Sequence, residues 1–413
     1  MSPARTFSTL AEIVRNGYCL SCGLCTQVVE PGAVDMQFTR DDQLRPRARR
    51  TLSDAENARI VAVCPGVSVR GPFGRELANP DPVWGDIRAT YEGWATDPGI
   101  RYRASAGGVM TAINRYLLES GRADFIVQVR PGGPDALTSE PVFVRDPEQL
   151  LTGAQSRYAP SAPLSAINAA LATGEKFAVS LKPCDVAGVR NLQGTNPRAA
   201  RQIVFATAMF CGTVPSRETS WKFLRRKGED PQADPPSAFR WRGNGCPGAT
   251  KATWADGREV SGTYNDLWNV ERWTTQFRCK ICPDAIGLQA DIATGDFWPG
   301  GAPTKETPGE NGIIAHTGIG AEVLGDCIGG GYLTVRDTDL ETIAASQPHH
   351  VRLRQTFAAR SAGATDGGLP MPSFHDLAAE ACAAMLDQND IAETRRGTRA
   401  RVAAGQGDEC TEF

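Results

Sequence analysis

The sequence predicts an α/β fold. From about residue 90 onward, short apolar runs of strand length alternate with stretches in which apolar residues recur at helical spacing. This alternation is typical of a sheet whose strands are connected by helices. The 413 residues suffice for two or three domains with cores of their own. Turn-forming residues gather at 71–82, so we place the first domain boundary there.

The expected elements follow in order along the chain. Ser53 or Asp54 can cap a helix at 53–63. Small residues open a second helix at 105–120, which ends at Gly121. Apolar runs of strand length predict five strands, at 124–129, 176–181, 203–210, 291–294 and 312–316. Further helices are expected at 161–172, 185–193, 318–327 and 374–387.

We expect three parts: residues 1–80 with the first cysteines, an α/β core at 81–340, and a helical extension at 341–413. The tail after Arg395 is polar and is expected to be disordered. A net charge of −3 gives no reason to expect nucleic-acid binding. No apolar run approaches the roughly 18 residues of a membrane span, and the N-terminus lacks a signal-peptide pattern. We therefore expect a cytoplasmic protein, whose cysteines are metal ligands or catalytic groups rather than disulfides.

Four cysteines near the N-terminus have the spacing of iron–sulfur ligands. Cys19, Cys22 and Cys25 are separated by two residues each, so one tight loop can direct three thiolates at one corner of a cluster. Cys64, followed by Pro65, can supply the fourth ligand of a 4Fe–4S cluster. Structural zinc is the alternative, although zinc sites usually present two separate CxxC pairs. The pattern favours a redox protein that moves single electrons.

A second set of four cysteines is predicted from the expected sheet. Cys184 and Cys211 each end a predicted strand, and the carboxyl ends of parallel strands share the edge where ligands bind. Cys279 and Cys282 form a CxxC pair that could meet them and hold a second cluster. Cys246 competes for one of these places, and a buried apolar role for Cys184 or Cys211 is the alternative.

The segment from Arg103 to Gly108 is a candidate dinucleotide site. Ser105, Gly107 and Gly108 would let the backbone approach a ligand, and free N–H groups at a helix start attract phosphate. The segment is not the GxGxxG fingerprint. From spacing alone, an ordinary glycine-containing helix start explains it slightly better.

Together these motifs resemble the coenzyme F420 hydrogenase/dehydrogenase beta subunit family, over roughly residues 15–335. The resemblance depends on the order of several short motifs: the N-terminal cysteines, Arg101-x-Arg103-Ala-Ser105-Ala-Gly107-Gly108, Gly153-x-x-Ser156-Arg157-Tyr158, Lys182-Pro-Cys184, Phe210-Cys211, Cys279-x-x-Cys282-x-Asp284 and Ala290-Asp291-Ile292-x-x-Gly295-Asp296. The chain departs from the family at His316-Thr317, where members often have Arg-Thr.

The resemblance implies FAD and one or two 4Fe–4S clusters on a mixed α/β core with a small ferredoxin-like N-terminal part. The implied FAD contacts are Arg103, Ser105, Gly107, Gly108, Ser156, Tyr158, Lys182 and Asp291. Lys182, Asp284 and Asp296 are the candidate catalytic residues, because each could transfer a proton near the flavin.

We expect an oxidoreductase that passes electrons from ferredoxin, or a similar carrier, through two clusters to FAD and on to a small organic substrate. Family members such as 7-hydroxymethyl chlorophyll a reductase and divinyl chlorophyllide 8-vinyl reductase act in this way. The alternative is an electron-transfer beta subunit of a hydrogenase or dehydrogenase that uses coenzyme F420, and a zinc-stabilised scaffold is the third reading. The basic patch at Arg45, Arg47, Arg49 and Arg50 is a candidate ferredoxin dock, with a solvated surface as the alternative. A homo-oligomer is also consistent with the sequence.

Overall fold

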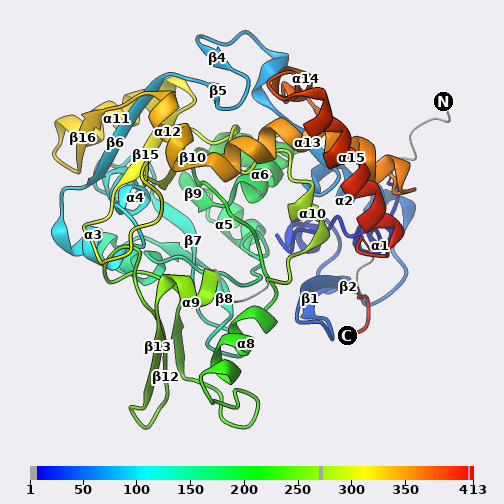
Figure 1. Cartoon of the computed structure of the whole chain (residues 1–413), viewed down its shortest axis with the longest axis horizontal. Coiled ribbons are helices and arrows are strands. Elements are labelled where there is room, and N and C mark those ends of the chain that lie inside the picture. Colours follow the sequence, from blue (N-terminus) through cyan, green and yellow to red (C-terminus); the bar gives the residue numbers. More distant parts are fainter. Residues whose placement is uncertain (1–6, 269–272, 408–409) are drawn as a thin grey trace.

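The computed structural model describes residues 7–268, 273–407 and 410–413, and it confirms the α/β class. The strands of its largest sheet are, in spatial order, β16 (Leu333–Asp337), β6 (Ala89–Ala95), β15 (Asn311–Ala315), β14 (Ile292–Asp296), β10 (Ile203–Met209), β9 (Phe177–Leu181), β7 (Phe125–Pro131) and β8 (Ser139–Val144). From β14 to β7 the strands run parallel, and the strands on either side are antiparallel. The sheet is therefore mixed (Figure 1).

Helices cover both faces of this sheet. The helices α5 (Ile167–Ala172), α6 (Pro183–Thr195) and α7 (Pro197–Gln202) share one buried apolar cluster with Phe125 and Val127 of β7. The helices α4 (Val109–Glu119) and α11 (Gly318–Gly329) share another with Ile126. Successive side chains of a strand point to opposite faces, so an apolar run in a central strand fills both clusters.

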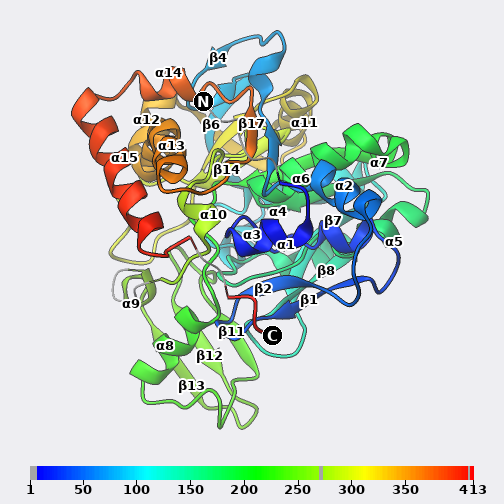
Figure 2. The same ribbon diagram turned by 90° about the vertical axis from the view of Figure 1, so that its right-hand side faces the viewer.

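The N-terminal part shares its core with the end of the chain. It contains α1 (Leu10–Arg15), the hairpin of β1 (Val34–Phe38) and β2 (Leu44–Ala48), and α2 (Asp54–Val63). The helix predicted at 53–63 is confirmed, with Ser53 and Glu56 forming a capping box. Side chains of this part pack with Phe277, Ala364 and Val402, and the Arg40 amide donates to the carbonyl of Glu412 (2.9 Å). The last residues therefore lie beside the hairpin (Figure 2).

A small sheet projects from the body of the molecule (Figure 1). It comprises β11 (Ala238–Arg240), β12 (Thr250–Thr253) and β13 (Glu259–Gly262), with α8 (Glu218–Arg226) beside it. Three tryptophans, Trp221, Trp241 and Trp254, are buried in its core. Their role is packing.

The remaining elements are short connections, apart from the C-terminal helices. They are η1 (Leu24–Gln27), β3 (Ser68–Arg70), η2 (Pro72–Gly74), β4 (Pro80–Asp81), β5 (Gly85–Asp86), α3 (Pro98–Arg103), η3 (Pro147–Gly153), α9 (Tyr264–Trp268), α10 (Phe277–Lys280), α12 (Leu340–Ser346), α13 (Pro348–Asp366), β17 (Ser373–His375), α14 (Ala379–Ala383) and α15 (Gln388–Ala403). Within the described ranges, every helix is too short or too polar to cross a membrane.

The C-terminal expectations were wrong. The predicted helix at 374–387 is a strand, β17, followed by the short α14, and the tail after Arg395 continues α15 instead of being disordered. The helix α15 is mostly polar and gives a weak periodic signal. Contact with α13 stabilises it: a Cβ on Gly363 would lie 2.4 Å from the Arg395 carbonyl oxygen. Tertiary packing therefore outweighs local pattern here.

Two predicted helices begin later than expected. The helix expected at 161–172 begins at Ile167. The helix expected at 105–120 begins at Val109, because Gly108 takes a left-handed conformation (φ 80°) and ends the preceding loop. The segment from Ser105 to Gly108 is thus a loop before the helix.

His316 follows β15 and is buried. Its Nδ1 lies 3.1 Å from the carbonyl oxygen of Asp86, and burial lowers its pKa below the usual value. The unfolded chain takes up a proton near pH 6.5, whereas folded His316 stays neutral. Its contribution to stability is therefore complete above pH 6.5 and is lost as the pH falls.

We expect the His316→Asn variant to lose less stability on acidification than the wild type. The wild type should lose up to about 1.4 kcal/mol per pH unit through this group below pH 6.5. Midpoints of thermal unfolding at pH 7.5 and 5.5, measured anaerobically, test this. The exposed His375 gives the control, His375→Asn, which should keep the wild-type drop. Equal drops in all three proteins would contradict the prediction.

Candidate functional site

The first four cysteines are gathered by one loop and one helix end. Cys19, Cys22 and Cys25 lie on the turn that leads into η1, where Ser21 and Gly23 take positive φ values of 63° and 83°. Cys64 is the C-cap of α2. Burial raises the pKa of Cys22, and the charges of Cys64 and Cys25 raise it further. Cys19 likewise raises the pKa of Cys25 and Cys64. All four thiols therefore lie close together.

The second four cysteines meet at the carboxyl edge of the parallel strands. Cys184 follows β9 and Cys211 follows β10, its parallel neighbour. Burial raises the pKa of Cys211, and the charges of Cys279 and Cys282 raise it further. The thiol of Cys184 experiences the charges of Cys211 and Cys279 in the same way. These four residues form a second thiol set.

Cys246 lies apart from both thiol sets. The charged groups that affect its thiol are Asp296, Arg242 and Glu306. Its backbone bridges to Thr307. Cys246 therefore belongs to the loop opposite the cysteines.

Each thiol set supplies four cysteine sulfurs. In the parts of the chain that the structure describes, no group of three or more His, Cys, Asp or Glu side chains is close enough to hold one metal ion. Four cysteine thiolates are the usual donor set of a 4Fe–4S cluster, and tetrahedral zinc can use the same donors.

An ion pair on α6 acts on thiols of both sets. Lys182 Nζ is 2.5 Å from Asp185 Oδ2, on the first turn of α6. The Asp185 charge raises the pKa of Cys22 in the first set and of Cys184 and Cys211 in the second. Asp185 Oδ1 is buried and finds no hydrogen-bond partner among the described residues. Burial raises the pKa of Asp185, and Lys182 opposes that change.

Arg278, which the sequence analysis did not single out, connects the backbones of the two sets. It is 1% exposed. Its guanidinium donates to the carbonyls of Gly66 (3.0 Å) and Pro65 (3.3 Å), directly after Cys64, and to that of Ile281 (3.4 Å), directly before Cys282. One cation therefore holds both cysteine loops.

A second buried connection reaches the sulfur atoms themselves. The Ser21 amide donates to Cys19 Sγ (3.4 Å), and the Arg45 guanidinium donates to Ser21 Oγ (2.9 Å) and Gln276 Oε1 (3.3 Å). Gln276 Nε2 in turn donates to Cys279 Sγ (3.4 Å). Hydrogen bonds to cluster sulfurs are one determinant of reduction potential. This chain of bonds therefore links a thiol of one set to a thiol of the other.

The structure removes Arg45 from the candidate ferredoxin dock. Arg45 is completely buried in the connection just described. Arg49 pairs with Asp35 (3.0 Å) and Arg50 with Glu56 (2.7 Å). Arg47 donates to Gln37. The contacts that bury Arg45 come from Ser21 and Gln276, which the charge pattern alone does not reveal.

A cavity of about 820 Å³, here called the strand-edge cavity, opens at the carboxyl ends of the parallel strands. Such a volume is typical of small-molecule sites. Six of the residues predicted to bind or act line it: Ser105, Gly108, Ser156, Tyr158, Lys182 and Asp296. Cys211 lines it too, so the cavity adjoins the second thiol set.

Four other candidate residues lie away from the strand-edge cavity. Arg103 is exposed. Gly107 packs against β6 and β15, where a Cβ would lie 2.7 Å from Asn311 Oδ1. Asp284 accepts the amides of residues 286–288. Asp291 accepts the Ala206 amide and pairs with Arg190 (3.1 Å). The two carboxylates thus hold loops in place.

The wall of the strand-edge cavity contains an ion pair. The sequence analysis singled out its acid, Asp296, but not its base, Arg242. Arg242, which is 3% exposed, holds both carboxylate oxygens of Asp296, at 2.9 and 3.0 Å. It also donates to the Ser105 carbonyl (2.7 Å). Burial would lower the pKa of Arg242, but Asp296 raises it well above the usual value, so the guanidinium stays charged. No local motif marks Arg242, because its partner lies 54 residues away.

The geometry describes a redox site, with two thiol sets beside one cofactor-sized cavity. Comparison with known proteins agrees. Models described as coenzyme F420 hydrogenase/dehydrogenase beta subunit, N-term and C terminus, match residues 90–168 and 174–341. The chain belongs to this family, and the resemblance noted in the sequence is confirmed.

The matched relatives are oxidoreductase components. The chain is 26% identical over 203 residues to the F420-dependent formate dehydrogenase 1 subunit beta of Methanococcus maripaludis, covering 49% of this chain and 50% of the relative. It is 32% identical over 192 residues to the coenzyme F420-dependent sulfite reductase of Methanocaldococcus jannaschii, covering 45% of this chain and 26% of the relative. It is 23% identical over 304 residues to the coenzyme F420 hydrogenase subunit beta of Methanothermobacter thermautotrophicus, covering 70% of this chain and 99% of the relative. The chain thus spans half or less of the length of the first two of these relatives.

A solved structure has a similar fold. It is a chain of the F420-reducing [NiFe] hydrogenase complex from Methanosarcina barkeri, at 21% identity and a TM-score of 0.50. The match covers 68% of this chain and 96% of that one. This likeness supports the mixed α/β fold.

We expect Asp296→Asn to lower the free energy of unfolding by about 3 kcal/mol, because it leaves the buried charge of Arg242 without its counter-ion. Chemical denaturation of the purified protein measures the change. Asp337→Asn, an exposed carboxylate on β16, is the matched control and should change stability by less than about 0.5 kcal/mol. An Asp296→Asn variant as stable as this control would show that the pair does not stabilise the wall.

Proposed function

We propose that this protein is an iron–sulfur flavoprotein that transfers electrons between two 4Fe–4S clusters and FAD, and exchanges hydride with a coenzyme of the F420 type. One observation carries the proposal. The charge of Asp185 acts on thiols of both sets, and the Lys182–Asp185 pair lines a cavity of about 820 Å³. The named functions of the relatives favour F420 over a ferredoxin-driven reduction of a small organic acceptor.

The ligand sets follow from the two groups of thiols. Cys19, Cys22, Cys25 and Cys64 would hold the first cluster. Cys184, Cys211, Cys279 and Cys282 would hold the second, without Cys246. When bound, a flavin supplies the conversion between two-electron and one-electron chemistry, and clusters carry single electrons.

The residues of the strand-edge cavity have distinct proposed roles. Ser105, Gly108, Ser156 and Tyr158 would bind and orient the FAD. Lys182, held by Asp185, places a positive charge at the cavity wall and is the strongest candidate to hold or donate a proton. Because Asp296 is engaged by Arg242, we assign it to positioning the wall rather than to proton transfer.

The choice of hydride partner can be tested with reduced F420 and reduced ferredoxin offered separately to the anaerobic, reconstituted protein. The flavin absorbance should fall when reduced F420 is mixed with the protein, because hydride transfer needs no further carrier. Bleaching by ferredoxin alone would instead support the self-contained reductase. Stable co-purification with a hydrogenase or dehydrogenase subunit would further support the hypothesis that this chain is an electron-transfer subunit of such a complex.

The second ligand set predicts different iron contents for two cysteine variants. Cys211→Ser should lose roughly four of about eight iron atoms and the matching acid-labile sulfide. Cys246→Ser should keep all of them, because its thiol lies apart from the set. Iron and sulfide analysis after anaerobic purification gives the answer. Loss of iron from Cys246→Ser with retention in Cys211→Ser would reverse the assignment.

A further inference from the structure

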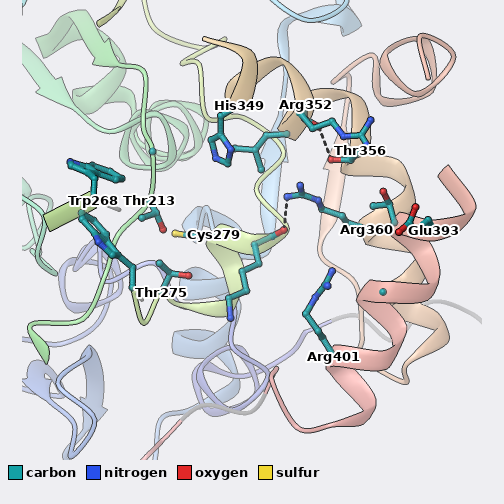
Figure 3. Close-up of a pocket in the computed structure, with 16 residues that line it drawn as sticks. Thr213, Trp268, Thr275, Cys279, His349, Arg352, Thr356, Arg360, Glu393 and Arg401 are labelled. Atoms are coloured by element: carbon teal, nitrogen blue, oxygen red, sulfur yellow. Dashed lines mark hydrogen bonds between the residues drawn. The ribbon is translucent and has the colours of Figure 1, made fainter. Parts of the chain in front are cut away.

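A second cavity, of about 850 Å³, lies between the second thiol set and the C-terminal helices. We call it the α13–α15 cavity. In Figure 3, Trp268, Thr213 and Thr275 lie on one side, Arg360 and Arg401 lie on the other, and Cys279 lies between them. The family models end at residue 341. The helices α13 and α15, which form the second wall, are therefore an addition to the part of the chain that the family defines.

Three cationic side chains that line the α13–α15 cavity form no ion pair with the residues that the structure describes. Arg360, Arg401 and Lys280 line the cavity. Across residues 7–268, 273–407 and 410–413, none of these three has a carboxylate within 4.0 Å. Arg360 donates instead to the carbonyl of Lys280 (3.0 Å), and Arg401 donates to Thr398 Oγ1 (3.2 Å). Neither acceptor supplies a counter-charge to the guanidinium.

The other charges of the cavity do not cancel this excess. Arg352 also lines it, but pairs with Asp390 at 2.8 Å. Glu393 is the acidic side chain among the lining residues. Burial lowers the pKa of Arg360, and repulsion from Arg401 and Arg352 lowers it further. Like charges thus converge on one hollow, and a bound anion would relieve their repulsion.

The opposite wall is aromatic. Trp268 and Trp273 stack with ring centroids 4.1 Å apart, and both line the cavity. Such a surface accepts the less polar part of a ligand while guanidinium groups hold its charges. The cavity also shares Gly212, Thr213, Trp268 and His349 with the strand-edge cavity, so one extended ligand can occupy both.

We propose that the α13–α15 cavity is an anion-binding site for a small molecule with several carboxylate or phosphate groups, held by Arg360, Arg401 and Lys280. The ligand is either a free polyanion or the anionic end of the hydride-exchanging substrate. The second source depends on the proposed function, and the first does not.

The test is calorimetric titration of the cofactor-loaded protein with inorganic pyrophosphate and, separately, with citrate. Arg401 is exposed on α15, so Arg401→Gln should leave folding intact. It should weaken binding of at least one probe roughly tenfold or more, and adding Arg360→Gln should weaken it further. Binding should also weaken as ionic strength rises. The control Arg396→Gln/Arg399→Gln removes two exposed charges of the same helix outside the cavity, and it should bind as the wild type does.

Steady-state assays with reduced F420 distinguish the two sources. A raised KM with unchanged kcat in Arg401→Gln, together with weaker probe binding, identifies the anionic end of the substrate. Weaker probe binding with an unchanged KM identifies a free polyanion. If neither probe binds the wild type, or if Arg401→Gln and the control bind alike, the site does not exist, whatever the outcome for the proposed function.

Discussion

The structure depends on one constraint, which is that eight thiols from distant stretches of the chain must stay together in two sets. Thiols that carry charge repel one another, and here their burial adds to the cost. Two buried arginines counter this. Arg278 binds the carbonyls of both cysteine loops, and Arg45 bonds to both Ser21 and Gln276, whose own donors reach Cys19 and Cys279. Positive charge therefore holds the two loops at a fixed separation.

The same principle shapes the strand-edge cavity. Lys182 faces Asp185 on one wall, and Arg242 faces Asp296 on another. Each cation is anchored by an acid and surrounded by backbone or aromatic groups, so the wall keeps its shape without a ligand. A preorganised wall of this kind loses little conformational freedom when a cofactor binds.

Much of this arrangement was readable from the sequence, for a physical reason. The strands at 176–181 and 203–210 are continuous apolar runs, and parallel strands present their carboxyl ends at one edge. The expected meeting of Cys184 and Cys211 with the CxxC pair follows from that rule, and the structure brings these four together. The iron they are proposed to bind remains a prediction.

What the sequence did not reveal depends on contacts between distant residues. Arg242 and Arg278 sit in no motif, and Arg45 looks like a surface charge although it is buried against Ser21 and Gln276. The helix α15 lacks a clear apolar stripe, and its close approach to Gly363 decides its conformation. Local propensity contains none of this information.

The core shared by the two ends of the chain has a consequence for biosynthesis. Phe7, Tyr18 and Ile60 pack in one cluster with Ala364, and Val402 packs against that cluster. While the protein is being synthesised, the apolar faces around the first cysteines stay exposed to water until residues 364–402 have left the ribosome. The core of the N-terminal part is thus completed only after the C-terminal helices have been translated.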